Sequence, residues 1–147
     1  MLPQTRLEDD IKTAMKERQA DKLSTLRLLL GAVKNRKIEL GTDLDDAEFL
    51  ALVQKAIKQR RDAAEQYAKG GRDELAAKEE AEIGVLEAYL PEQASEDDIR
   101  AAIAQLIASE GLEGPKAMGP VMKAMKEKFG GATDGQTLSR LARELLA

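Results

Sequence analysis

The chemistry open to this chain is limited first by the residue types that it lacks. Its 147 residues include no His and no Cys. Histidine is the usual general base near neutral pH, and a cysteine thiolate is the usual sulfur nucleophile and zinc ligand. No two glycines are spaced G-x-G and no glycine precedes a lysine, so the dinucleotide and P-loop signatures are missing. We therefore expect no catalytic residue, no metal and no cofactor in the chain acting alone.

The chemistry that remains is the binding of anions by lysine and arginine. The formal charge is −4, but residues 24–61 carry eight basic side chains against five acidic ones, and residues 115–147 carry six against three. Residues 62–92 carry three against nine. Arg and Lys are the natural donors to phosphate oxygens. Local surfaces could therefore hold a polyanion that the whole molecule would not attract, although solvated helix faces explain the same charge blocks.

Helices must position these side chains, because apolar residues recur with a 3.6-residue period and no segment alternates as a strand would. The sequence predicts an all-α fold with seven helical segments. Ser95 and Asp98 stand in capping-box spacing after the PEQAS segment, and we place a domain boundary there. We expect a helical N-terminal domain of about four helices over residues 1–92 and a small three-helix bundle over residues 93–147. The segments lie near residues 4–18, 22–40, 43–69, 72–90, 96–111, 115–129 and 135–146.

Angular position separates the charged residues that should be structural from those that should face solvent. At about 100° per residue, Arg60 falls in the middle of the apolar stripe of the third segment, and Glu79 and Glu82 fall within that of the fourth. A hairpin about Gly70-Gly71 would bring these residues level with one another. The sequence therefore predicts a partly buried ion pair of Arg60 with Glu82 or Glu79.

The basic residues that point away from the apolar stripes are the candidates for contact with phosphate, with ordinary solubilising lysines as the alternative. The paired glycines after the sixth segment would let backbone approach a ligand, and the amides after Asp134 open a helix N-terminus; a tight helix connection explains both features equally well. Aromatic residues make up only 3% of the chain, so we expect little stacking of bases on side chains. Any RNA would instead be recognised through its phosphate backbone and its shape, as structured RNA permits. The candidates are Arg27, Lys34, Lys55, Lys58, Arg61, Lys116, Lys123, Lys126, Gly130 and Gly131.

Three stretches of the chain together resemble the YqeY-like family. They are STLRLLLGAVKNRKIEL (24–40), KAIKQRRDAAEQYAKGGRDELAAKEEAEIGVLEAYLPEQ (55–93) and MGPVMKAMKEKFGGATDGQTLSRLARELL (118–146). The last is similar to the region that this family shares with the tail of the B subunit of glutamine-dependent aspartyl/glutamyl-tRNA amidotransferase (the GatB/YqeY domain). The resemblance covers nearly the whole chain, and the IKQRR run and the LPEQ boundary are its most specific parts.

The resemblance implies a helical N-terminal part, a three-helix tail, and tRNA as the ligand of that tail. By position, Met118, Gly119, Val121, Met122 and Lys123 match the family's M-G-x-V-M-K stretch, and residues 130–135 match its glycine-containing turn. Two departures weaken a phosphate-binding interpretation of the tail. Gly131 stands where a basic residue commonly follows the first glycine, and Pro120 replaces a residue that is commonly basic.

Three functional hypotheses follow. The first is a non-catalytic module that binds tRNA or another structured RNA, accessory to tRNA-dependent amidation. The second, from the family association, is an auxiliary amidotransferase-like protein (carbon–nitrogen ligase activity with glutamine as amido-N-donor) that works with amidotransferase subunits. The third is an adaptor that binds another protein through the acidic residues 62–92 or through a helical groove. We expect no DNA partner. We also expect no membrane partner, since no apolar run reaches 18 residues. Without cysteine and without a signal-peptide pattern in MLPQTRLEDDIK, we expect a cytoplasmic location.

Overall fold

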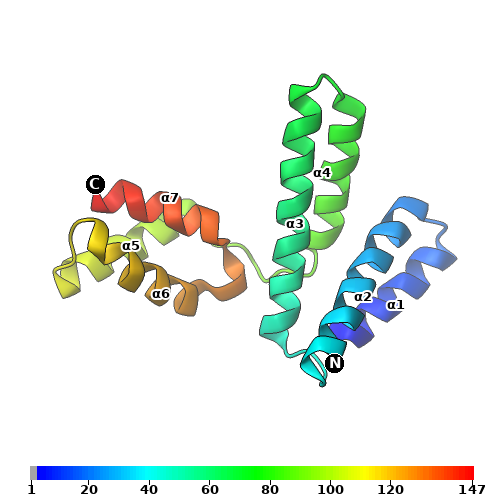
Figure 1. Cartoon of the computed structure of the whole chain (residues 1–147), viewed down its shortest axis with the longest axis horizontal. Coiled ribbons are helices and arrows are strands. Elements are labelled where there is room, and N and C mark those ends of the chain that lie inside the picture. The colour runs from blue at the N-terminus through cyan, green and yellow to red at the C-terminus, as the bar shows by residue number, and fades with distance from the viewer. Residues whose placement is uncertain (1–2) are drawn as a thin grey trace. The chain divides into compact units, whose positions relative to one another are not determined.

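The computed structural model describes residues 3–147, and all the regular structure within that range is helical (Figure 1). The prediction of an all-α fold is confirmed. The chain divides into two compact units, one ending at Leu90 and the other formed by Pro91–Ala147; the sequence placed its boundary after residue 92. The elements are α1 (Pro3–Lys16), α2 (Ala20–Leu40), α3 (Asp46–Lys69), α4 (Asp73–Glu87), α5 (Glu96–Glu110), α6 (Met118–Phe129) and α7 (Gly135–Leu146), with 3₁₀ turns η1 (Pro115–Ala117) and η2 (Gly130–Ala132).

Helices α1 to α4 form the first unit around a single apolar core. α1 packs against α2, α3 packs against α4, and α2 also contacts both members of the second pair. Figure 1 shows α3 and α4 as an antiparallel hairpin beside the shorter α1–α2 hairpin. The buried residues of this core come from all four helices and from the segments that follow α2 and α4: Leu7, Ala14, Leu26, Leu29, Val33, Leu44, Phe49, Val53, Ile57, Ile83, Leu86 and Tyr89.

The start of α3 differs from the prediction. The helix begins at Asp46, whereas the sequence placed this segment from about residue 43, and Asp45 caps it by accepting a hydrogen bond from the Glu48 amide at 2.8 Å. Leu44 explains the shift, because its side chain is buried in the core and the chain must deliver it there before the helix begins. Leu44 and Phe49 have the spacing of a hydrophobic staple around the capping residue, and both belong to the core.

A polar clamp holds α1 to the end of α4. The Tyr89 hydroxyl donates a hydrogen bond to the Asp10 carboxylate. The Arg6 guanidinium donates to the carbonyl of Ala88 at 2.8 Å and lies 4.5 Å from the centre of the Tyr89 ring. The same ring meets Phe49 edge-on, with centroids 5.9 Å apart. Tyr89 therefore joins an aromatic contact in the core to charged groups at its edge.

Helices α5, α6 and α7 form the second unit around a separate core. Ser95 caps α5 by accepting from the Asp98 amide at 3.1 Å, and α5 ends at Gly111 in the left-handed conformation, both as the sequence indicates. Asp134 caps α7 by accepting from the Thr137 amide at 2.7 Å. The buried core residues are Ile99, Ala102, Ile103, Val121, Met125, Leu138, Leu141 and Ala142.

Two helix ends and four apolar residues depart from the sequence-based pattern. α1 stops at Lys16, two residues before the predicted end, and Arg18 has a positive φ of 56° in the turn that follows. α4 stops at Glu87, because the Tyr89 and Leu90 amides donate to carbonyls three residues back. Four apolar residues share the helical period of their segments and are nevertheless 37–53% exposed, because each lies in a terminal turn of its helix: Met15, Leu40, Leu75 and Leu145.

Candidate nucleic-acid interface

Arg60 lies in the interface of the α3–α4 hairpin, where it forms an ion pair. Its Nε lies 3.2 Å from Oε2 of Glu82, and the two side chains are only 13% and 17% exposed. The Arg60 guanidinium also donates to the carbonyl of Ala56 at 3.0 Å. Glu79 lies beside the pair, and burial together with the negative charge of Glu82 raises the pKa of its carboxyl. Of the two acids that the sequence offered, Glu82 is the hydrogen-bonded partner.

Two further arginines connect α5 to α7 on the surface of the second unit. Arg140 donates to Glu96 at 2.8 Å, and this hydrogen bond is the main cause that lowers the pKa of the Glu96 carboxyl. Arg100 lies 3.4 Å from Glu144 and 3.5 Å from Glu96. Our sequence reasoning missed this network, although the four-residue spacing of Glu96 with Arg100 and of Arg140 with Glu144 was a usable signal. These guanidiniums join the surfaces of α5 and α7 through ion pairs.

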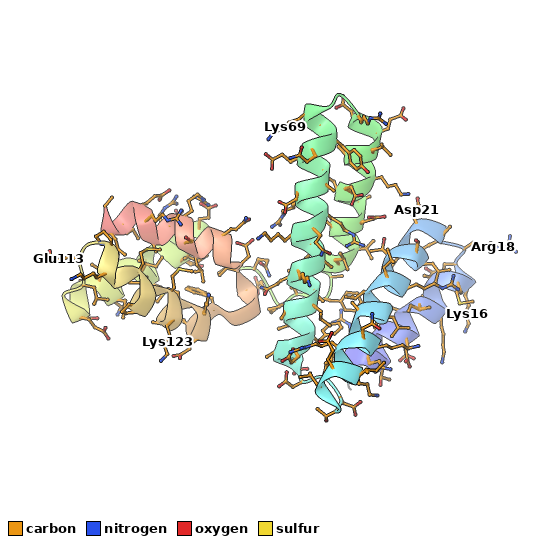
Figure 2. The ribbon with its side chains drawn as sticks, viewed as in Figure 1. Lys16, Arg18, Asp21, Lys69, Glu113 and Lys123 are labelled. Atoms are coloured by element: carbon orange, nitrogen blue, oxygen red, sulfur yellow. The ribbon has the colours of Figure 1, made fainter. Side chains whose placement is uncertain are left out.

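The lysines around α6 have different surroundings. Lys116, Lys123 and Lys126 are exposed, and none forms an ion pair with another of residues 3–147. Lys123 and Lys126 lie on the side of α6 opposite buried Val121, with Lys116 just before the helix. Figure 2 shows the Lys123 side chain extending away from the second unit. We call Lys116, Lys123, Lys126 and Gly130 the α6 surface; Glu127 lies at its flank.

The glycine turn after α6 has a structural task of its own. Gly130 has φ 53° and ψ −123°, a conformation that residues with a Cβ rarely adopt. The carbonyl of Gly131 accepts from the Gln93 side chain at 3.0 Å, and the carbonyl of Ala132 accepts from the Ala94 amide at 2.8 Å. The turn thus holds the segment that leads into α5.

The first amides of α7 are less available to an anion than the sequence suggested. Asp134 places a carboxylate over the first amides of this helix, in the position where a bound phosphate would have to lie. A second negative group there would be repelled. Of the two interpretations left open for this turn, the observed contacts favour a tight helix connection.

The basic candidates of the first unit do not form one uniform surface. Lys34, Lys55 and Lys58 are exposed and form no ion pair within the described part of the chain. Arg61, by contrast, lies 3.7 Å from Glu87, and the Arg27 guanidinium approaches the sulfur of Met15 at 3.9 Å. Acidic residues of α3 alternate with its basic ones along the outer face, so the local positive field is weaker than around α6.

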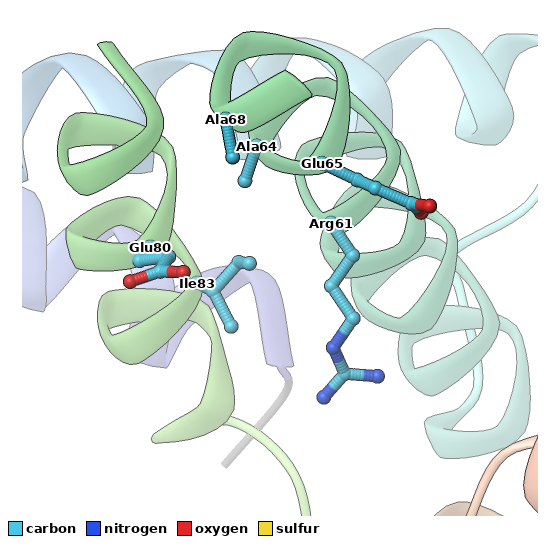
Figure 3. A pocket seen from close by; sticks show the side chains of 6 residues that line it. All are labelled: Arg61, Ala64, Glu65, Ala68, Glu80 and Ile83. Carbon is cyan, nitrogen blue, oxygen red and sulfur yellow. The ribbon is translucent and has the colours of Figure 1, made fainter. Parts of the chain in front are cut away.

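A shallow groove of about 380 Å³ lies between α3 and α4 near Arg61 (Figure 3). Ala64, Ala68 and Ile83 form its apolar part, and charged side chains of both signs border it.

Within residues 3–147 no cluster of acidic side chains is placed to hold a metal ion. No helix of the described chain has the length and apolar character that crossing a membrane requires. The groove brings together no nucleophile and base.

Comparison with known proteins gives a family match over almost the entire sequence. The Yqey-like protein family matches residues 4–146. A protein named "Altered inheritance of mitochondria protein 41, mitochondrial" from Lachancea thermotolerans is 36% identical over 104 residues, 69% of this chain and 56% of the relative. Its namesake in Meyerozyma guilliermondii is 34% identical over 111 residues, covering 71% and 58%. That of Pyrenophora tritici-repentis is 30% identical over 145 residues, covering 96% and 79%. The chain thus spans somewhat more than half the length of the first two relatives.

The same comparison corrects one expectation. The sequence led us to expect a cytoplasmic location, and this expectation is wrong, because these relatives are named as mitochondrial proteins. The absence of cysteine says only that the chain forms no disulfide, and it does not distinguish one compartment from another.

Proposed function

We propose that this chain, which belongs to the YqeY-like protein family, is a non-catalytic helical module that binds tRNA or another structured RNA through the α6 surface. The observation that carries the proposal is the difference between the two kinds of cation. The arginines at helix interfaces are held by carboxylates, whereas Lys116, Lys123 and Lys126 extend into solvent without an ion partner among the described residues. An unpaired ammonium group can exchange its counterion for a phosphate oxygen at little structural cost.

The mode of binding follows from what surrounds these lysines. Phe49 and Tyr89 are buried in the first core, and Phe129 packs against the second core. Phe129 is only partly buried, and the ammonium group of Lys128 lies 6.0 Å from the centre of its ring, so little aromatic surface is left for unstacked bases beside the lysines of α6 and base stacking contributes little. Contacts from lysine side chains alone recognise the phosphate backbone and the shape of a folded RNA.

A titration of labelled tRNA followed by fluorescence anisotropy tests the proposal. We expect saturable binding at low salt and its loss in the variant Lys116→Glu/Lys123→Glu/Lys126→Glu. The matched control is Lys78→Glu on α4, an exposed lysine that also forms no ion pair within residues 3–147. Binding that survives the triple change, or that the control abolishes equally, would place the RNA elsewhere.

The two other hypotheses differ from this proposal in what they require. An auxiliary role in amide transfer would appear as a change in amidotransferase rate when the chain is added to the other subunits. An adaptor role through residues 62–92 would leave tRNA unbound and would depend on the acidic side chains of α4. If the chain fails to bind tRNA at low salt, the adaptor hypothesis becomes the better one.

A further inference from the structure

Helix α2 exposes an apolar stripe that its own unit does not cover. Ile38 is 79% exposed and Leu28 is 63% exposed, the largest values among the exposed large apolar side chains. Gly31 and Asn35 lie between them and are also exposed. The intervals along the chain are three, four and three residues, so the four positions follow a heptad with Leu28 and Asn35 at a, and Gly31 and Ile38 at d.

The stripe lies on the side of α2 opposite the core. Leu26, Leu29 and Val33 face α1, α3 and α4, and at about 100° per residue the stripe points away from them. A Cβ placed on Gly31 would meet no atom within 4 Å. Another helix could therefore approach the α2 backbone closely at Gly31 without disturbing the first unit.

Charges of opposite sign border the stripe. Arg27 and Lys34 occupy g positions on one side, and Glu39 occupies an e position on the other. Lys34 forms no ion pair with another described residue. Glu39 accepts from Arg36 at 2.9 Å, but its side chain remains 64% exposed and has further acceptor capacity.

We propose that a second copy of this chain docks on the stripe, with the two α2 helices parallel about a twofold axis. In a parallel pair a g residue faces the e residue five positions later in the other helix, which brings Lys34 of one copy to Glu39 of the other, twice by symmetry. An antiparallel pair would instead set the basic side of the stripe against itself. Asn35 meets Asn35 of the other copy, the arrangement that fixes register in parallel two-stranded coils.

The size of the stripe sets the strength of the association. One helix face with two large apolar side chains is smaller than a standard stable interface, which buries about 800 Å² on each partner. The dimer therefore forms as the protein concentration rises and dissociates on dilution. Its formation requires no RNA.

Sedimentation equilibrium of the full chain over a wide concentration range, without RNA, tests the proposal. We expect a monomer–dimer equilibrium whose association constant falls about tenfold or more in Ile38→Glu, because two charges would enter the apolar contact. Leu75→Glu is the matched control, an exposed apolar residue on α4 whose change should leave association intact. A monomer at every concentration, or a dimer unaffected by Ile38→Glu, would overturn the proposal.

A charge exchange tests the orientation. Lys34→Glu and Glu39→Lys should each weaken association about threefold or more, and the double variant should restore it. If Lys34→Glu strengthens association, the helices are antiparallel and the proposal is wrong. Circular dichroism of each variant verifies that the helices remain folded, as expected for substitutions at solvent-exposed positions.

Discussion

Arg60 and Lys123 carry the same formal charge, but their surroundings give them different tasks. The Arg60 side chain is 13% exposed and bonded to Glu82, and its removal would leave a carboxylate in a largely apolar interface. Lys123 is exposed and forms no ion pair within the described residues, so its removal would leave the fold intact. Replacing Arg60 should therefore lower the free energy of unfolding, and replacing Lys123 should weaken RNA binding without changing stability.

A double-mutant cycle measures the Arg60–Glu82 pair. We expect Arg60→Met to lower the free energy of unfolding by about 3 kcal/mol, because Glu82 loses its partner next to Glu79. Glu82→Gln in the Arg60→Met background should recover part of this loss. Urea unfolding of the four proteins gives the coupling energy. Purely additive single effects would mean that the two side chains do not interact in solution.

Tyr89 gives a second prediction, for the clamp between α1 and α4. Tyr89→Phe removes the hydrogen bond to Asp10 and keeps the ring, so we expect a loss of about 1.5 kcal/mol in the free energy of unfolding. Denaturant unfolding near neutral pH measures the loss. An unchanged unfolding midpoint would show that water replaces the bond at no cost.

The same residue predicts a pH dependence. Burial raises the pKa of the Tyr89 phenol, and its bond to Asp10 adds to the effect. The folded protein therefore keeps this proton at a pH where the unfolded phenol, with a pKa of about 10, releases it. Stability should fall as the pH rises above about 10, and Tyr89→Phe should flatten this fall. If the stability of the wild-type chain and of Tyr89→Phe fell equally steeply with pH, the pH dependence could not be assigned to Tyr89.

The sequence reveals a charged residue best when that residue interrupts a regular pattern. Arg60 lies in an apolar stripe, so its pairing with α4 could be proposed from the residue pattern alone. Arg100 and Arg140 interrupt no stripe, and their contacts across α5 and α7 join residues 44 positions apart. Only the packing of these two helices specifies such pairs.

At the scale of elements, the turn between α6 and α7 depends on the backbone of Gly130. Gly130→Ala should cost about 1–3 kcal/mol, because its φ of 53° with ψ of −123° is strained for any residue with a Cβ. Gly84→Ala on α4 is the control, since a Cβ there meets no atom within 4 Å and alanine favours a helix by about 1 kcal/mol. Thermal unfolding of both variants should shift in opposite directions, and shifts of the same sign would contradict this account.

Helix existence could be predicted from the sequence more reliably than helix limits. The caps Ser95 and Asp134 stand next to strong periodic segments and could be placed in advance. Asp45 could not, because the position of its helix depends on the burial of Leu44 in a core that other helices complete. In α2, the helical period places Leu29 in the apolar stripe and Leu28 outside it, and Leu29 is indeed buried and Leu28 exposed.

At the scale of the whole molecule, two separate cores should respond separately to damage. Leu26 and Leu141 are fully buried in different units. Leu26→Ala and Leu141→Ala should each cost about 2–5 kcal/mol, and their effects should add in the double variant. Hydrogen exchange should show faster opening only in the unit that carries the substitution. Accelerated exchange across both units from one substitution would mean that the chain opens as a single cooperative block.

The family could be predicted from three quoted stretches of the sequence, and the match over residues 4–146 confirms it. The location could not, since composition reflects solubility and disulfide chemistry, which several compartments share. The sequence also could not separate paired from unpaired basic side chains, because the contacts of each cation exist only in the folded chain; our choice of the α6 surface as the proposed RNA site rests on those contacts.

The salt dependence of tRNA binding tests the central claim most directly. For the wild-type chain we expect the logarithm of the binding constant to fall linearly with the logarithm of salt concentration. In Lys116→Gln/Lys123→Gln/Lys126→Gln the slope should be shallower by about one for each phosphate that the variant no longer binds, while Lys78→Gln keeps the wild-type slope. An unchanged slope in the triple variant, or no binding by the wild-type chain at low salt, would contradict the assignment of the α6 surface to RNA.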